Sequence, residues 1–256
     1  MIDAMSLKLR TRAGHLLAGL EGGLNKIMTI WLLLAMSACS LRVGIASMGV
    51  GETGVSTAFP YILVTVAPLV SISFALRWFG NSDARAATPG RFERREKWRY
   101  LPIEEARTHP LYGPSGIMVS LLVGILLNVP VRLGEYLVAI PAIPAGVPAW
   151  LSTLHLMMTI DVVLMTSLYT IVFVAALKRA PLFPALLMSV WAFDLSMQLF
   201  IAEMVTAQGL PATVAAPLHS LLEGNVKKVF ISVAIWLPYL ILSRRVNVTY
   251  RRRVAA

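Results

Sequence analysis

Residues 150–205 read WLSTLHLMMTIDVVLMTSLYTIVFVAALKRAPLFPALLMSVWAFDLSMQLFIAEMV, which is two long apolar segments joined by a short basic connection. The first segment covers residues 150–177, the second covers residues 182–205, and Lys178 and Arg179 lie between them. A helix needs about 20 apolar residues to cross the hydrocarbon of a bilayer. In lipid, every backbone N–H and C=O must also be paired within the segment. The stretch therefore predicts two adjacent membrane-spanning helices with a tight basic turn.

Four further apolar segments of the same kind occur along the chain. Hydrophobic residues make up 57% of its 256 residues, charged residues make up 14%, and the mean hydropathy is +0.71. Soluble domains carry roughly 25% charged residues, so the composition indicates lipid as the solvent. A membrane barrel would show alternating segments of about 10 residues, whereas these runs are continuous. We predict an all-α fold, a polytopic membrane helix bundle with six transmembrane helices over residues 27–48, 57–79, 115–136, 150–177, 182–205 and 226–242.

The lysine and arginine residues predict the orientation of this bundle. Most of them lie in four blocks: the N-terminal arm, residues 77–114, the turn at 178–179, and the tail from 244 to 253. Six alternating helices place all four blocks on one side, and positive loops stay in the cytoplasm. We therefore expect both termini in the cytoplasm, with the protein in an inner membrane. The net charge of +10 then faces anionic lipid headgroups, and no nucleic-acid partner is expected.

The segments between the spans predict the domain organisation. Leucines among basic residues predict an amphipathic helix in the arm, lying on the membrane surface. Residues 93–99 favour a short charged helix, and the prolines of residues 141–148 exclude a regular helix there. The predicted parts are an amphipathic arm (1–26), a two-helix membrane extension (27–79), a basic loop (80–114), a four-helix membrane domain (115–243) and a basic tail (244–256).

Polar residues inside the predicted spans are the candidate functional groups, because burying them in hydrocarbon is costly. Asp161 and Asp194 fall near the midplane of two adjacent helices, and Arg42 lies in the outer half of the first span. On the third span, polar residues recur at i, i+4 and i+7, which is one helical stripe. The candidate intramembrane polar cluster comprises Asp161, Asp194, Arg42, Arg132, Glu135, Asn128 and Gln198.

This cluster has a functional and a structural interpretation. In the functional one, a cavity opens to the periplasm, Asp161 and Asp194 form its floor, and Arg42 and Arg132 are counter-charges. Two neighbouring carboxylates can share a proton or hold a cation. In the structural one, the acids pair with the arginines and fix the register of the helices, or one of the two acids is simply neutral.

Other chemistry finds less support in the sequence. Two facing imidazoles can hold a haem, but His155 and His219 lie close to the outer surface, so no haem is expected and any cofactor stays unknown. His219 and Glu223, four residues apart, could form a catalytic dyad or a partly solvated pair. The single cysteine excludes an intramolecular disulfide. No nucleotide-binding loop, zinc spacing or nucleophile elbow occurs, so an enzyme is not the favoured interpretation.

The end of the chain resembles a known bacterial membrane family. Residues 235–250 read IWLPYLILSRRVNVTY, and residues 177–184 read LKRAPLFP. The first motif is similar to the closing helix and tail, and the second to the basic inner turn, of the family called domain of unknown function 2569. The resemblance covers roughly residues 112–250, which include four of the predicted helices. It implies a bacterial membrane protein and no particular activity, since the family is named for lacking one.

Two function classes follow from these patterns. The first is a non-catalytic accessory or docking subunit of a larger membrane assembly, with other membrane proteins as partners. The second is a small proton- or cation-coupled transporter that uses the midplane carboxylates, and an enzyme acting on lipids is a more distant third. The basic residues expected to face lipid or a partner are Arg91, Arg94, Arg95, Lys97, Arg99, Arg244 and Arg245.

Overall fold

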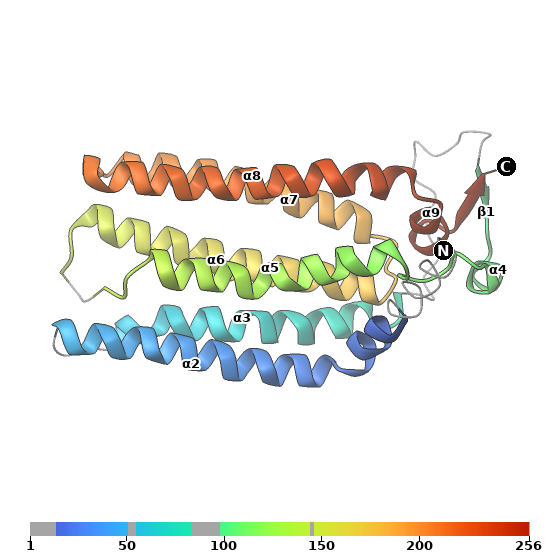
Figure 1. Ribbon diagram of the computed structural model, residues 1–256, viewed down its shortest axis with the longest axis horizontal. Coiled ribbons are helices and arrows are strands. Elements are labelled where there is room, and N and C mark those ends of the chain that lie inside the picture. Colours follow the sequence, from blue (N-terminus) through green and yellow to red (C-terminus); the bar gives the residue numbers. More distant parts are fainter. Residues whose placement is uncertain (1–13, 51–54, 83–97, 144–145, 256) are drawn as a thin grey trace, which may run out of the picture.

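Six long helices form an antiparallel bundle in the computed structural model (Figure 1). The structure describes residues 14–50, 55–82, 98–143 and 146–255. All six helices are long and apolar enough to cross a membrane, which confirms the predicted helical bundle and is typical of a multi-pass membrane protein. These helices are α2 (Leu24–Val50), α3 (Val55–Phe79), α5 (Ile117–Ala139), α6 (Ala149–Leu177), α7 (Phe183–Thr206) and α8 (Ala212–Leu242).

Helix α6 is the centre of the bundle. It packs against α3, α5 and α7, and two thirds of its most apolar stretch (67%) is buried inside the protein. For α2 and α8 the buried share is 11% and 17%, and large apolar side chains such as Leu33, Leu41 and Ile235 are exposed. An exposed apolar surface is costly in water but not in lipid. The polar residues with the deepest burial therefore fall on and around α6.

The sixth helix begins earlier than the sequence predicts. Residues 206–225 were expected to form a connection, but α8 begins at Ala212 with Pro211 as its N-cap. Lys227 and Lys228, at the start of the predicted sixth span, instead lie near the middle of α8, where Lys227 pairs with Glu223 at 2.6 Å. The polar residues of this half helix lower its hydropathy, which is why the apolar run begins only at residue 226.

A small folded unit, here called the platform, covers one end of the bundle (Figure 1). It consists of β1 (Trp98–Tyr100), α4 (Ile103–Thr108), α9 (Arg244–Tyr250) and β2 (Arg253–Ala255). The two strands are antiparallel, and the N–H of Leu101 donates to the carbonyl of Arg252 at 2.8 Å. The all-α prediction therefore misses a short β-ribbon. Of the charged helix expected over residues 93–99, residues 93–97 lie outside the described residues and the rest belongs to β1.

The platform is fastened to the bundle by buried contacts. The Tyr250 hydroxyl donates to the carbonyl of Ala176 at 2.9 Å, and its ring lies 4.8 Å from that of Phe183. Complete burial raises the pKa of Tyr250 well above its usual range, so this hydroxyl stays protonated and keeps donating. Arg245 donates to the carbonyl of Gly113 at 3.2 Å and to the hydroxyl of Ser115 at 2.5 Å. The tail predicted to be merely basic is therefore part of the packed structure.

Six antiparallel helices place the segment before the first helix and the segment after the last helix at the same end of the bundle. Residues 14–22, within the predicted arm, are helical, whereas the first 13 residues lie outside the described part of the chain. This helix, the platform and the turn at 178–182 lie at the same end of the bundle (Figure 1). The predicted break at 141–148 is present in the residues described there, and α6 begins directly after Pro148.

Candidate functional site

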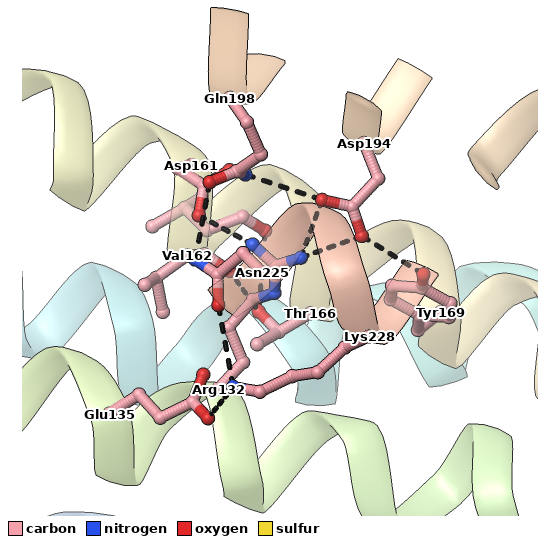
Figure 2. Close-up of polar contacts among 11 residues, drawn as sticks. Arg132, Glu135, Asp161, Val162, Thr166, Tyr169, Asp194, Gln198, Asn225 and Lys228 are labelled. Carbon is pink, nitrogen blue, oxygen red and sulfur yellow. Dashed lines mark hydrogen bonds and ion pairs between the residues drawn. The ribbon is translucent and has the colours of Figure 1, made fainter. Parts of the chain in front are cut away.

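One arginine bridges two aspartates between three helices. Arg132 of α5 donates from Nη1 to Asp161 Oδ2 of α6 at 2.7 Å. Its Nη2 donates to Asp194 of α7 at 2.5 Å (Oδ1) and 2.6 Å (Oδ2). Figure 2 shows the guanidinium between the two carboxylates. Arg132 is 7% exposed, Asp161 is 1% exposed and Asp194 is fully buried, so all three charged side chains lie inside the bundle.

Neutral polar groups complete the hydrogen bonding of the two acids (Figure 2). The Tyr169 hydroxyl donates to Asp194 Oδ2 at 3.0 Å. The Gln198 amide donates to Asp161 Oδ1 at 3.2 Å and to Asp194 Oδ1 at 3.3 Å, and it accepts from Asn225 of α8 at 3.1 Å. We call the six residues of this network the central cluster: Arg132, Asp161, Tyr169, Asp194, Gln198 and Asn225.

The central cluster lies about midway along the bundle. Asp161 is the thirteenth residue of α6 and Asp194 the twelfth residue of α7. At a rise of about 1.5 Å per residue, both lie about 16–18 Å from the starts of their helices. The two helices run antiparallel and are joined by a tight turn in which Arg179 adopts a left-handed conformation (φ 54°). This turn makes α6 and α7 neighbours and brings their aspartates within reach of one guanidinium.

The charges of the central cluster do not cancel. Two ionised carboxylates beside one guanidinium leave a surplus negative charge, and an uncompensated charge in a low-dielectric interior is very costly. One bound proton restores neutrality, because a protonated carboxyl group carries no charge. Asp194 accepts from Arg132, Tyr169 and Gln198, whereas Asp161 accepts from Arg132 and Gln198. Asp194 therefore accepts hydrogen bonds from one more residue than Asp161 does.

A small crevice connects the cluster to the gap between α5 and α8. Its cavity volume is about 40 Å³, and its lining includes Arg132, Asp194, Asn128 and Ser232. This is enough space for a water molecule, and the buried Asn128 Oδ1 has no hydrogen-bond partner within the protein. At the crevice edge, Lys228 forms an ion pair with Glu135 (Figure 2). Arg132 and Asp194 are therefore reachable through a short polar path.

The structure brings together some of the predicted site residues and separates others. Arg132, Asp161, Asp194 and Gln198 form the core of the network, while Glu135 and Asn128 line the adjoining crevice. Arg42 lies elsewhere and donates to the carbonyl of Ile140 at 3.1 Å. It therefore neutralises neither aspartate.

Three residues of this region were not part of the predicted polar cluster. Tyr169 is eight residues after Asp161, which is the same face two turns on, but a tyrosine in a span resembles ordinary packing. Asn225 was placed in the connection before the sixth span and Lys228 at the start of that span, whereas both lie near the middle of α8. Asn225 and Lys228 share a face only because α8 extends through both of them.

The predicted basic surface is described only in part. Arg91, Arg94, Arg95 and Lys97 lie outside the described residues. Arg99 is exposed and pairs with Glu105 at 2.7 Å, and Arg244 is also exposed. Arg245, which was expected to face lipid or a partner, donates from its guanidinium to residues 111–115 of the chain itself.

The histidines take no part in the central cluster. His155 is buried beside the rings of Tyr61 and Tyr136, with centroid distances of 6.4 and 6.3 Å. Glu223, which was considered as a partner of His219, forms an ion pair with Lys227. Within the described residues, no group of three or more His, Cys, Asp or Glu side chains is arranged to hold a metal ion.

The fold and this site define a helical multi-pass membrane protein with a charged network buried midway along its bundle. Comparison of the chain with models of known protein families, with curated proteins and with solved structures gives no match.

Proposed function

We propose that the chain is a small proton-coupled carrier of the bacterial inner membrane. The surplus negative charge of the Arg132–Asp161–Asp194 group carries this proposal, because it creates a need for one proton in the membrane interior. A fully matched arginine–aspartate pair would need no proton and would serve packing alone. Buried carboxylates that exchange a proton are the usual means by which carriers couple to a proton gradient.

The crevice between α5 and α8 supplies an access route. A proton that arrives through the water-sized cavity meets Asp194, which lines it, before Asp161, which is deeper. Arg132 contacts both acids, so it can turn toward whichever carboxylate has lost its proton. Lys228 and Glu135 close the mouth of the crevice as an ion pair, and their separation would open it.

Reconstituted vesicles test this function. Wild-type protein in liposomes should show proton uptake driven by a potassium diffusion potential when the transported solute is present, so uptake is measured without solute and with each of a panel of small solutes. Asp161→Asn and Asp194→Asn should reduce uptake to the level of empty liposomes, because each leaves a neutral arginine–aspartate pair. A pH-sensitive dye inside the vesicles reports the flux.

A matched control is Glu105→Gln in the platform, which removes an exposed carboxylate and should leave the uptake unchanged. Wild-type uptake no greater than that of empty liposomes, with every solute in the panel, would contradict the proposal.

A docking subunit is the second candidate, and the platform favours it. The platform is an ordered unit fastened to the bundle by Arg245 and Tyr250, and its residues Arg99 and Arg244 are both exposed. Such a fixed surface suits contact with another protein or with anionic headgroups. Inactive vesicles combined with a co-purifying membrane protein would favour this second function.

We also propose that residues 112–250 are a divergent member of the domain of unknown function 2569 family. The two motifs that carry the resemblance meet in space. Tyr250, from the closing motif, donates to Ala176 immediately before the basic turn, and its ring packs on Phe183 within that turn motif. Because the two motifs are in contact, they are suited to a common structural role.

The proposed orientation places the platform in the cytoplasm, in keeping with its basic character. Single cysteines at two exposed positions, Thr108→Cys in α4 and Gln208→Cys at the opposite end, test it in a Cys39→Ala background. In intact cells, a membrane-impermeant maleimide should label position 208 and leave position 108 unlabelled until the inner membrane is opened. Labelling of position 108 in intact cells would reverse the orientation.

A further inference from the structure

Helix α8 carries an ion pair on the side that faces away from the bundle. Glu223 and Lys227, one helical turn apart, pair at 2.6 Å, and their side chains are 65% and 67% exposed. Asn225 lies between them in the sequence and faces inward, because it is 6% exposed and donates to Gln198 of α7. Residues two positions apart on a helix point about 160° apart. The pair therefore lies on the outward face of α8, which forms one edge of the bundle (Figure 1).

These two charges lie well inside the predicted hydrocarbon layer. Gln198 lies eight residues before the end of α7 at Thr206, which is about 12 Å along the helix axis. The 24 residues of α7 span about 36 Å, little more than the hydrocarbon thickness of about 30 Å. Gln198 and its partner Asn225 are therefore roughly 10 Å from the nearer edge of the hydrocarbon. Glu223 lies about 3 Å nearer to that edge, and Lys227 lies about 3 Å deeper.

An ion pair at this depth is costly on a surface that faces lipid. Taking two charges out of water costs more than their mutual attraction returns, unless further hydrogen bonds satisfy them. Ionisable residues within spanning segments therefore face the interior of a bundle or a water-filled cavity. In a single copy of the chain, the side chains of Glu223 and Lys227 are largely exposed. This exposure indicates that another protein surface covers them in the membrane.

The residues along this face have the spacing of a helix–helix contact. Positions that are alternately four and three residues apart, the a and d positions of a heptad, follow one face of a helix. On α8 this spacing runs through residues that are all exposed: Ala216, Ser220, Glu223, Lys227, Phe230 and Ala234. The two alanines and the serine are small enough to let two helices approach closely. We call these six residues the α8 seam.

The charges of the α8 seam select a second copy of the same chain as the covering surface. Two copies inserted in the same orientation have parallel α8 helices, with Glu223 and Lys227 at the same depth in both. A twofold axis along the membrane normal then brings each Glu223 next to Lys227 of the partner subunit, and the four charges sum to zero. A symmetric contact needs a surface that is complementary to itself, and a seam with one charge of each sign meets this need. A seam with charges of one sign would instead need a different partner.

We propose that the α8 seam is the interface of a symmetric dimer of this chain, in which Glu223 of each copy pairs with Lys227 of the partner subunit. Each carboxylate then contacts two ammonium groups, its own and the partner's, and the interface excludes lipid from all four charges. The central cluster and its crevice lie on the opposite face of α8, where Asn225 and Val229 point. Dimerisation therefore does not depend on proton transfer at the central cluster.

Disulfide trapping in native membranes tests the contact with every charge in place. In a Cys39→Ala background, Ala234→Cys puts a thiol in the seam. Ile235→Cys is the matched control, because residue 235 is also exposed and lies at nearly the same depth but points about 100° away. Oxidation with copper phenanthroline should convert most of the Ala234→Cys protein, and little of the Ile235→Cys protein, into a covalent dimer.

An exchange of charges tests the pairing. Energy transfer between full-length copies labelled at Thr108→Cys, in the Cys39→Ala background, gives the dimer dissociation constant in liposomes of varied protein-to-lipid ratio. Glu223→Lys fills the seam with like charges and should weaken dimerisation by about tenfold or more. The double variant Glu223→Lys, Lys227→Glu keeps the reciprocal pairs with their signs exchanged and should restore dimerisation. Glu105→Lys on the platform makes the same change outside the seam and should have no effect.

Several results would overturn the dimer. These are equal trapping of Ala234→Cys and Ile235→Cys, trapping of Ala234→Cys to a different protein in place of its own copy, or wild-type monomers at every protein-to-lipid ratio. A double variant that dimerises no better than Glu223→Lys would also contradict the reciprocal pairing. If Glu223→Lys does not accumulate in the membrane, the trapping experiment decides, since it leaves both charges in place.

Discussion

Replacing Arg132 by methionine should destabilise the protein by about 3 to 5 kcal/mol, which is the range for breaking a buried ion pair by removing one partner. The substitution leaves Asp161 and Asp194 buried without their shared counter-charge. Both acids must then take up protons or remain as uncompensated charges, and either outcome loses three hydrogen bonds from the guanidinium. Thermal unfolding in a mild detergent, followed by loss of solubility or by circular dichroism, measures the effect.

Two comparisons make this result specific to the buried charge. Arg99→Met removes an exposed guanidinium that also pairs with an acid and should cost no more than about 1 kcal/mol. The triple variant Arg132→Met, Asp161→Asn, Asp194→Asn removes all three charges and should recover part of the lost stability. If Arg132→Met unfolds at the same temperature as wild type, the bridging contact contributes nothing to the fold.

A second large effect is expected in the protonation state of the central cluster. Wild-type protein at neutral pH should hold one protonated carboxyl group in the bundle interior, because the two aspartates share a single positive charge. The C=O stretch of such a group is visible by infrared difference spectroscopy. Asp161→Asn should abolish this band, since the remaining Asp194 is matched by Arg132 and stays ionised.

The same variant should retain its stability to within about 1 kcal/mol of wild type, because the amide can still accept from Arg132 and the charge count is balanced. Asp161→Asn and Arg132→Met are therefore expected to differ sharply although both remove one member of the same group. Glu135→Gln, at the crevice edge, is the control and should leave the band in place. A band that survives in both aspartate variants would place the proton elsewhere.

The sequence predicts the six helices because length and hydropathy are local properties. Each apolar run is long enough by itself to cross a bilayer, and α6 begins directly after Pro148, close to the predicted start at residue 150. The stripe on α5 also predicts Arg132 as a residue that faces the bundle, since i and i+4 positions share a face.

Contacts between distant segments explain what the sequence does not predict. Arg42 and Arg132 have the same charge and both lie in spans, yet only Arg132 meets the aspartates, because α5 rather than α2 neighbours α6 at that depth. Likewise, nothing local to Trp98–Tyr100 indicates a strand, since its partner is the three residues Arg253–Ala255. The start of α8 is missed because polar residues that serve the bundle interior, such as Asn225, lower the hydropathy of the helix.

The β1–β2 ribbon affects the order in which the protein can assemble. Its two strands are separated in the sequence by α5, α6, α7 and α8, so their pairing closes a loop of about 150 residues. Closing so long a loop is entropically unfavourable until the intervening helices have brought its ends together. The ribbon can therefore form only after the last hairpin has been inserted and docked, and its formation would mark a chain whose insertion is complete.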